Sequence, residues 1–247
     1  MNVLSCPAKI NLFLAIKNRD QNGYHEIDTI LHRTDKITDL IYIEKAENFS
    51  LDCAEIPADE NNTIVKAVKL LEKESGKKLN YKIRVEKNIP AMSGLGGGSS
   101  DAAAVMIFLN EHEGLKITHE RLMKMSEEIG MDTAFFISGF NTAFASHYGE
   151  KLTELPNLPD DLDFDIHFSG VNVSTKEAYA KWDMQNKKSI VDSSKIIAAI
   201  KAKDSDKILA NLHNDFESIF PKPDSYLYGY DFPLLTGSGG AFCSFHH

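Results

Sequence analysis

A glycine-rich run that opens directly into a helix-forming stretch is the feature that most constrains how this chain folds. Residues 93–100 read Ser-Gly-Leu-Gly-Gly-Gly-Ser-Ser, and the alanine-rich residues 101–106 follow at once. Glycines let peptide N–H groups turn inward, and the first helical turn adds unpaired donors at the positive end of the helix dipole. Such a junction is suited to an anion, above all a phosphate chain. A flexible linker is the alternative, but apolar sequence bounds the run on both sides.

The sequence before this run predicts a sheet. Short stretches that alternate between apolar and polar residues are typical of antiparallel strands and not of repeated βαβ units. The predicted strands cover residues 3–5, 12–16, 29–32, 40–44, 49–53 and 81–86.

Helical spacing of apolar residues predicts one helix before the glycine-rich run and one after it. The first covers residues 63–74, with Asn62 or Thr63 as its cap, and the second covers residues 119–129, with a left-handed Gly130 as its stop. Between them, a helix that starts near residues 99–100 is apolar almost all round and is expected to lie centrally.

The second half of the sequence changes character after the proline-containing segment 156–161. With 43% hydrophobic residues the chain can bury a real core, and we predict two closely packed lobes, residues 1–155 and residues 156–247. The further predicted strands are residues 135–137, 142–146 and 164–168; the helices are residues 176–182, 194–203 and 207–219; and two short strands bracket the glycine turn 236–240.

Charge and cysteine content exclude several classes of protein. The chain has 27 Lys+Arg against 36 Asp+Glu and no long basic run, which argues against a nucleic-acid partner. Cys6, Cys53 and Cys243 are too far apart for a metal or redox pair and are expected to be thiols in a reducing compartment. Without a basic leader or a long apolar segment, the protein is expected to be cytoplasmic, with no membrane partner. The oligomeric state is not predicted.

Spacing separates the glycine run from two well-known phosphate loops. A Walker A loop ends in Gly-Lys-Ser/Thr, which the run lacks. A dinucleotide-binding fingerprint needs a third glycine where Ser99 stands, an opening βαβ unit and a later acidic residue, and only its first half is matched.

Four segments together resemble the GHMP kinases, the superfamily that includes galactokinase, homoserine kinase and mevalonate kinase. Residues 90–103 resemble its Pro-x-x-x-Gly-Leu-Gly-x-x-Ser-Ser phosphate loop. Three further segments resemble motifs of that superfamily and occur in its order. They are residues 7–14, which contain Lys-Ile-Asn-Leu and precede Gly-Tyr-His-Glu at 23–26, residues 130–136 and residues 170–179. The set is similar to the branch that phosphorylates a cytidine diphosphate-linked alcohol.

The resemblance implies an α+β, two-lobed GHMP kinase fold. Its N-terminal lobe has a mixed or antiparallel sheet with helices, as in the second domain of ribosomal protein S5, and its C-terminal lobe is also α+β. The chain departs from the pattern at four places: Met92 replaces a glycine, residues 133–134 replace Val-Pro, residues 147–150 replace Gly-x-Gly-Glu, and residues 220–235 are short for the usual helical segment.

Two residues carry the catalytic roles that the resemblance implies. Asp132 corresponds to the general base at the acceptor hydroxyl; the alternative is an ordinary turn residue after Gly130. Lys9 is expected to face Asp132 and the γ-phosphate, where its charge offsets transition-state charge; the alternative is a surface lysine. Positioning and electrostatic stabilisation are most of what phosphoryl transfer needs.

The resemblance also implies ATP as phosphoryl donor and Mg²⁺ as cofactor, with no protein ligands of the metal assigned. The hydroxyls of residues 99–100 would contact phosphate oxygens or magnesium, although either serine could instead cap the helix. Asn62 would touch adenine, although capping explains it equally well. The expected ATP-binding residues are Asn62, Pro90, Ala91, Met92, Ser93, Gly94, Leu95, Gly96, Gly97, Gly98, Ser99 and Ser100.

The implied acceptor is a small cytidine diphosphate-linked alcohol. Tyr24 and Tyr179 would stack on the cytosine ring, His25 would contact its edge, and Asn11 and Thr175 would donate or accept hydrogen bonds; half-buried core tyrosines are the alternative. The expected activity is ATP-dependent phosphorylation of this alcohol. The alternatives are another small-molecule kinase of the superfamily, of mevalonate or homoserine type, and a catalytically silent nucleotide-binding module.

Overall fold

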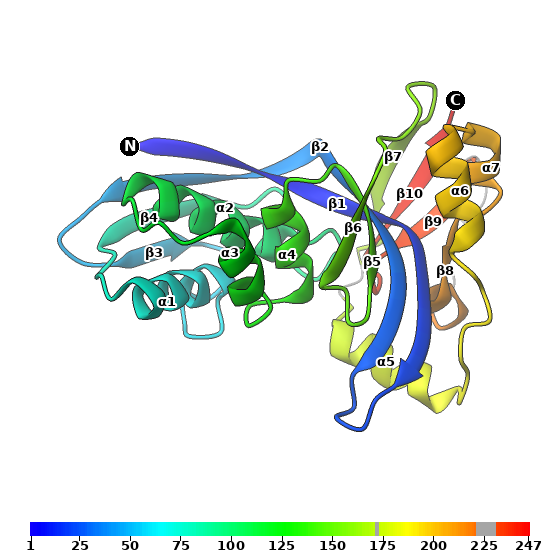
Figure 1. Ribbon diagram of the computed structural model, residues 1–247, viewed down its shortest axis with the longest axis horizontal. Helices are drawn as coiled ribbons and strands as arrows, with labels where there is room; N and C mark the ends of the chain where they lie inside the picture. Colours follow the sequence, from blue (N-terminus) through cyan, green and yellow to red (C-terminus); the bar gives the residue numbers. More distant parts are fainter. Residues whose placement is uncertain (171–172, 221–230) are drawn as a thin grey trace. The chain divides into compact units, whose positions relative to one another are not determined.

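The chain forms two compact units, each assembled from segments that are distant in sequence (Figure 1). The structure is a computed structural model that describes residues 1–170, 173–220 and 231–247, so part of the motif 170–179 and most of the segment 220–235 lie outside the described residues. Both units are discontinuous, and the contiguous lobes 1–155 and 156–247 stay a prediction. Unit 1 comprises Met1–Ala8, Asp35–Ala91 and Gly96–Gly139; unit 2 comprises Lys9–Thr34, Met92–Leu95 and Phe140–His247.

Two long strands open the chain and supply residues to both units. β1 spans Asn2–Arg19 and β2 spans His25–Lys45. The prediction of separate short strands over residues 3–16 and 29–44 was wrong, because polar residues were read as turn signals. Neither strand contains a glycine, and only Pro7 could have interrupted one of them.

Unit 1 packs helices beside a small mixed sheet. Its strands β3 (Ser50–Cys53) and β4 (Tyr81–Glu86) pair in parallel, and β4 pairs antiparallel with the second half of β2. The helices are α1 (Thr63–Ser75), α2 (Gly97–His112), α3 (His119–Ser126) and α4 (Met131–Ser138). Because α2 packs against both α1 and α4, its predicted central place is confirmed.

The predicted cap of α1 is confirmed, whereas the predicted cap of α2 is wrong. Asn62 caps α1 as predicted, since its Oδ1 accepts a hydrogen bond from Ile64 N at 2.9 Å. Helix α2, however, begins at Gly97 behind a left-handed Gly96 and has no side-chain cap, so capping by Ser99 or Ser100 was wrong. The glycine backbone turns into the helix before either serine is reached.

The residues around Gly130 also differ from prediction. Gly130 has an extended backbone, with φ of 173°, and precedes α4 instead of stopping α3 in a left-handed conformation. Residues 135–137, predicted as a strand, lie inside α4, where Phe135 and Phe136 are buried. A short apolar run fits a buried helix as well as a strand, and periodicity alone does not separate them.

Within its described residues, unit 2 contains mostly antiparallel strands and several short helices. In the sheet, β5 (Thr142–Ser146) pairs with β2 and with β6 (Lys151–Leu155), whereas β8 (His213–Asn214) pairs in parallel with β1. A second sheet has the order β7 (Asp163–Phe168), β10 (Ala241–His246), β9 (Pro233–Thr236). The helices are α5 (Thr175–Met184), α6 (Ser194–Ala202), α7 (Ser205–Leu209) and the 3-10 helix η1 (Asp215–Ser218).

Most of the elements predicted for this half of the chain are confirmed. The exception is the helix over residues 207–219, where the chain instead forms the end of α7, then β8 and η1. Asn214 explains the break, because its side chain donates to Leu235 O at 2.7 Å and to Gly237 O at 2.9 Å and accepts from Phe216 N. These tertiary hydrogen bonds override helical spacing.

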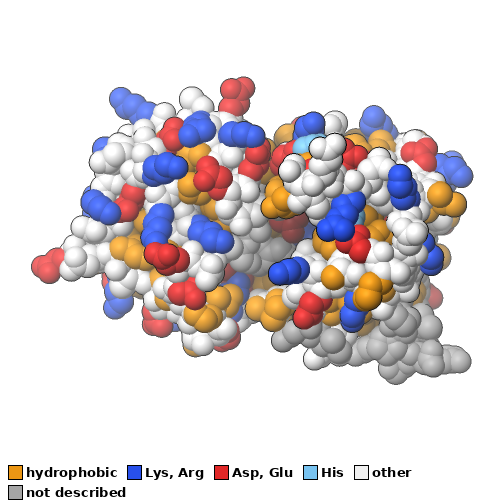
Figure 2. Space-filling view, turned by 90° about the horizontal axis from the view of Figure 1, so that it is seen from below, with side chains coloured by type: hydrophobic (Ala, Val, Ile, Leu, Met, Phe, Trp, Pro, Cys, Tyr) orange, Lys and Arg blue, Asp and Glu red, His pale blue; other side chains and the backbone are white. Residues whose placement is uncertain are grey.

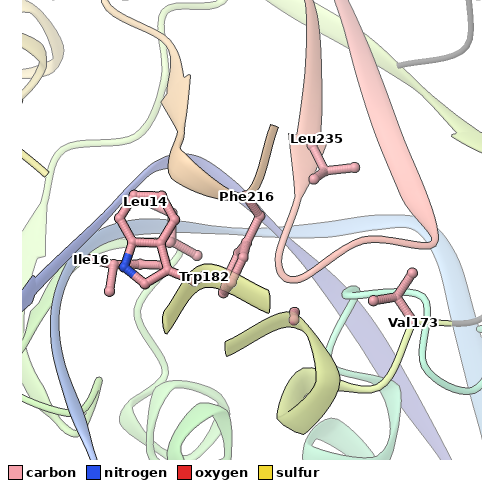
Figure 3. Close-up of a cluster of buried hydrophobic side chains, with 7 residues drawn as sticks. Leu14, Ile16, Val173, Trp182, Phe216 and Leu235 are labelled. Carbon is pink, nitrogen blue, oxygen red and sulfur yellow. The ribbon is translucent and has the colours of Figure 1, made fainter. Parts of the chain in front are cut away.

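A cluster of buried apolar side chains anchors α5 in unit 2 (Figure 3). Trp182 of α5 packs with Leu14 and Ile16 of β1 and with Phe216 of η1. Tyr179 and Ile27, both partly buried, pack against the same cluster. Apolar side chains therefore hold α5 against β1 and η1.

The surface carries charges of both signs. On the face shown in Figure 2, basic and acidic side chains are interspersed. None of the helices within the described ranges has the length and apolar character that crossing a bilayer requires.

Candidate active site

The glycine loop alternates left-handed residues with buried ones. Met92, Gly94 and Gly96 have φ of 57°, 82° and 74°, and Ser93 and Leu95 between them are buried. Met92, which replaces a glycine of the resembled loop pattern, thus adopts a backbone that favours glycine. A second departure behaves alike: His147 has φ of 65°. Both residues therefore carry the backbone strain of a non-glycine residue in the left-handed region.

Lys9 reaches into unit 2 from β1 and is buried. Its Nζ donates to Asn11 Oδ1 at 2.6 Å and to Gly94 O at 2.8 Å, and its backbone N donates to Leu95 O at 2.9 Å. With 3% of its surface exposed, Lys9 is not the surface lysine considered as an alternative. Its ammonium lies on the glycine loop.

Asn11 connects this lysine to the second glycine turn, residues 236–240. Its Oδ1 also accepts from Gly237 N at 2.9 Å, its backbone N donates to Thr236 Oγ1 at 3.1 Å, and its Nδ2 donates to Thr29 Oγ1 at 2.8 Å. Both ends of the amide are engaged, so the role that the structure gives Asn11 is to hold the two glycine turns. Contact with substrate stays a prediction.

The two glycine turns approach each other closely in unit 2. A Cβ on Gly237 would lie 2.8 Å from Gly94 Cα, and one on Gly240 would lie 2.7 Å from Met92 O. A Cβ on Gly94 would collide with Thr236 O. These positions require glycine, and the sequence signal for the partner turn was its Thr-Gly-Ser-Gly-Gly composition.

The turn between β1 and β2 presents Tyr24. Asp20 holds this turn, since its Oδ1 accepts from Tyr24 N at 2.8 Å and from Asn22 N at 2.9 Å. The Tyr24 ring packs against Tyr148 at 5.4 Å between centroids, and Tyr148 donates its hydroxyl to Asp20. Tyr24 is 58% exposed, so it is not a core residue.

His25 links this turn to helix α5. Its Nε2 lies 2.7 Å from Asp183 Oδ1, and its ring stacks on Tyr179 at 4.8 Å between centroids. Arg19 pairs with the other oxygen of Asp183 at 3.1 Å. Sequence reasoning missed Asp183 and Arg19.

Helical spacing could have revealed Asp183. Thr175, Tyr179 and Asp183 are four residues apart and therefore lie on one face of α5. At the start of that face, Thr175 Oγ1 lies 3.2 Å from Ser238 Oγ in the second glycine turn. The face carries two predicted substrate residues and the partner of a third.

In unit 1, Asp132 lies in the first turn of α4. An acidic side chain there interacts favourably with the helix dipole, so the observed position also fits the alternative role of an ordinary residue that follows Gly130 and starts the helix. A Cβ on Gly130 would lie 3.5 Å from Ser99 Oγ, which brings the start of α4 against the start of α2. A catalytic role for Asp132 stays a prediction.

Asn62 is engaged at both ends of its amide. Besides capping α1, it donates through Nδ2 to Pro57 O at 3.1 Å. The neighbouring Thr63 donates its hydroxyl to Gly98 O at 2.8 Å and so connects α1 to the glycine run. Capping is therefore observed, and adenine contact stays a prediction.

Oxygen donors suited to magnesium lie in unit 1. No three His, Cys, Asp or Glu side chains in the described part of the chain gather as a metal site. Within the same part, the buried hydroxyls of Ser100 and Thr133 have no hydrogen-bond partner. Hydroxyl oxygens fit Mg²⁺, which takes few protein ligands when it is bound together with phosphates.

Comparison with known proteins decides the family. The 4-diphosphocytidyl-2-C-methyl-D-erythritol kinase of Caldicellulosiruptor saccharolyticus is 37% identical over 221 residues, which cover 88% of this chain and 75% of that protein. The enzyme of the same name from Listeria monocytogenes is 34% identical over 249 residues, which cover 96% of this chain and 84% of the relative. Residues 62–140 match the model of the GHMP kinases N terminal domain.

The chain belongs to the GHMP kinases. It is accordingly an ATP-dependent kinase of small molecules, and ATP is its phosphoryl donor. The sequence predictions of the family and of the activity class are confirmed.

Solved structures confirm the predicted GHMP kinase fold. A crystal structure of 4-(cytidine 5'-diphospho)-2C-methyl-D-erythritol kinase has a TM-score of 0.78 and 27% identity, covering 98% of this chain and 89% of that chain. The mevalonate kinase of Methanococcus jannaschii has a TM-score of 0.67 at 14% identity, covering 100% of this chain and 90% of that chain, and supports the fold alone.

Proposed function

We propose that this GHMP kinase transfers the γ-phosphoryl group of ATP to the 2-hydroxyl of 4-diphosphocytidyl-2-C-methyl-D-erythritol. Relatives of that name, 34–37% identical over most of the chain, support this substrate. The observation that carries the proposal is the polar cluster of unit 2, in which buried Lys9 binds the glycine loop at Gly94. The same unit presents Tyr24 and His25 on one turn.

Charge and proton handling fall to Lys9 and Asp132. The Lys9 ammonium, fixed by Asn11 and Gly94, offsets negative charge on the group in transfer. The Asp132 carboxylate orients the acceptor hydroxyl and accepts its proton as the new P–O bond forms and the bond to ADP breaks. The hydroxyls of Ser99 and Ser100 would hold magnesium and phosphate oxygens, and the metal would supply positive charge beside the phosphates.

Selection of the acceptor depends on the aromatic residues of unit 2. Exposed Tyr24 offers a face on which a base stacks, a contact worth about 1–3 kcal/mol. Tyr179 contributes the second aromatic surface, and His25, stacked on it, contacts the base edge. The interaction of His25 with Asp183 orients the imidazole for this contact.

Turnover with defined acceptors tests the proposal. Purified protein with ATP, Mg²⁺ and 4-diphosphocytidyl-2-C-methyl-D-erythritol is expected to release ADP and to place the phosphate on the 2-hydroxyl, as measured by ³¹P NMR. Mevalonate and homoserine serve as comparison acceptors. If ADP is released with mevalonate or homoserine and not with the cytidine compound, the proposed substrate is wrong. Nucleotide binding without turnover on any of the three would favour a silent module.

Substitution of Asp132 tests the mechanism. Asp132→Asn is expected to bind ATP nearly as well as the parent and to lose at least a thousandfold in kcat, because proton acceptance fails. Asp52→Asn, at an exposed carboxylate on β3 of the same unit, is the matched control and should retain parental kcat. Parental kcat in Asp132→Asn would remove this residue from the mechanism.

A further inference from the structure

An ionic cluster is buried in unit 1 beside the glycine loop. Lys87, which directly follows β4, donates through Nζ to Asp39 Oδ2 of β2 and, at 2.8 Å, to Asp101 Oδ2 of α2. The side chains of Lys87, Asp39 and Asp101 are 5%, 0% and 3% exposed. Nothing in the mechanism above uses these three residues.

Asp39 fixes the chain where it enters the glycine loop. Its second oxygen, Oδ1, accepts from the backbone N–H groups of Asn88 at 2.6 Å and of Ile89 at 2.8 Å. A carboxylate that accepts two backbone N–H groups and an ammonium holds that backbone in one position. The loop begins at the next residue, Pro90.

Asp101 fixes the chain where it leaves the loop. It lies in α2, which begins at Gly97, and it reaches the same ammonium as Asp39. The start of α2 is pressed against the cluster, since a Cβ on Gly97 would lie 2.9 Å from Ile89 Cγ2 and 3.1 Å from Asp39 Oδ2. The two ends of the loop therefore meet at Lys87.

The cost of burying charge indicates that the cluster does more than stabilise the fold. Three buried charges are costly to desolvate, and apolar residues of similar volume are often as stable or more so. A loop with four glycines within residues 94–98, by contrast, loses much conformational entropy when it orders around a ligand. Fixing both of its ends in advance lowers that cost.

We propose that Lys87, Asp39 and Asp101 form an ionic clamp that holds the two ends of the glycine loop at the spacing required for nucleotide binding. They are positioning residues, since they act through the loop. The inference rests on the proposed function in one respect, namely that the loop binds the phosphates of ATP. Burial alone would lower the pKa of Lys87, but Asp101 and Asp39 raise it, so the bridging ammonium is charged.

Kinetics with Lys87→Met tests the clamp. Methionine retains the volume and removes the charge, and the KM for ATP is expected to rise at least tenfold while the KM for the acceptor alcohol stays within twofold. Lys82→Met, at an exposed lysine on β4, is the matched control and should keep both parental values. A parental KM for ATP in folded Lys87→Met would overturn the proposal.

A second pair of variants separates positioning from stability. Asp101→Asn keeps an acceptor for Lys87 and should fold even where Lys87→Met does not. Lys87→Met/Asp101→Leu removes one ion pair together and retains the two backbone hydrogen bonds of Asp39. Positioning predicts that the double variant has a higher midpoint of urea unfolding than Lys87→Met, because Asp101 no longer lies there as an uncompensated charge, but still binds ADP at least tenfold more weakly than the parent. Recovery of ADP affinity together with stability would reduce the cluster to a structural role.

Hydrogen exchange tests the clamp without any substrate. In the absence of nucleotide, the amides of residues 88–98 are expected to exchange at least tenfold faster in Asp101→Asn and in the double variant than in the parent, while β3 is unchanged. Equal exchange would contradict the clamp even if the kinase acts on another acceptor. A parent that exchanges as expected but fails to phosphorylate the cytidine compound would contradict the proposed function alone.

Discussion

The glycine loop is held in two different ways at its ends and at its middle. At the ends, in unit 1, the charged side chains of Lys87, Asp39 and Asp101 meet. In the middle, in unit 2, close backbone contact dominates: Gly94 lies against the second glycine turn, and its carbonyl oxygen also accepts a hydrogen bond from the Lys9 ammonium. Fixation by charge depends on ionisation and tolerates small changes of shape, whereas fixation by close contact depends on the absence of a Cβ. The two halves should therefore fail under different substitutions.

The largest expected effect is the loss of stability in Lys87→Met. Removal of one partner from a buried ion pair leaves uncompensated charge, and here both Asp39 and Asp101 lose their ammonium, at a cost of about 3–5 kcal/mol in the free energy of unfolding. Urea unfolding measures this cost against Lys82→Met, which should remain within about 0.5 kcal/mol of the parent. Equal costs in the two variants would mean that the end of the loop is not held by charge.

Gly94→Ala probes the middle of the loop. The new Cβ would collide with Thr236 O and would lie 3.1 Å from Gly239 O, and its φ of 82° is strained for alanine. Strain and overpacking together are expected to cost about 2–4 kcal/mol. The KM for ATP should rise as well, because the loop is displaced.

Gly76→Ala is the control that separates strain from collision. Gly76 has φ of 69°, and a Cβ there would meet nothing within 4 Å, so alanine is expected to cost only about 1 kcal/mol. If the two alanine variants lose equal stability, the close approach of the two turns contributes nothing.

Local sequence predicted the glycine turns at the middle of the loop but not the ionic cluster at its ends. The glycine run, its helix and the second glycine turn were visible because glycine composition reports backbone geometry directly. Lys87 stands between Glu86 and Asn88, a context typical of solvated residues. Only pairing of β2 with β4 brings Asp39 to it across 48 positions, and no local pattern reports such a contact.

The same distinction explains the other differences between sequence and structure. Residues 207–219 have helical spacing, but Asn214 forms tertiary hydrogen bonds that end the helix. Thr175 and Tyr179 lie within the motif 170–179, whereas Asp183, on the same face of α5, lies beyond its end and was missed. Spacing on a known helix would have been enough to find Asp183.

Asp101→Asn tests whether ionisation matters at the ends of the loop. Burial, offset in part by Lys87 and reinforced by Asp39, raises the pKa of Asp101 to about 6. A carboxyl group with a raised pKa in the folded state contributes stability below the unfolded pKa near 3.8, and this contribution is lost as the pH rises through 6. The parent should therefore lose on the order of 2 kcal/mol between pH 4 and pH 7 that Asp101→Asn does not lose.

Neither Cys6 nor His32 produces this difference. Burial and the neighbouring carboxylates raise the pKa of the Cys6 thiol, so it stays protonated over this range. Burial lowers the pKa of His32 to about 4, which removes stability as the pH falls and has the opposite sign. His32 is present in both proteins and cancels in the difference between their unfolding free energies. A difference that is constant from pH 4 to pH 7 would contradict ionisation of Asp101 in the folded state.

Met92→Gly is expected to have the smallest effect, and it has the opposite sign. Methionine at φ of 57° costs about 1–2 kcal/mol, and glycine would remove that strain while adding about 0.5–1 kcal/mol of backbone entropy to the unfolded chain. The net gain in unfolding free energy should be about 0.5 kcal/mol, measurable by urea unfolding. Met92→Ala removes the same exposed side chain beyond Cβ but keeps the strain, so it should bring no gain. Equal gains in both variants would assign the benefit to the lost side chain and not to the backbone, and the middle of the loop would then be less dependent on glycine geometry than its close contacts indicate.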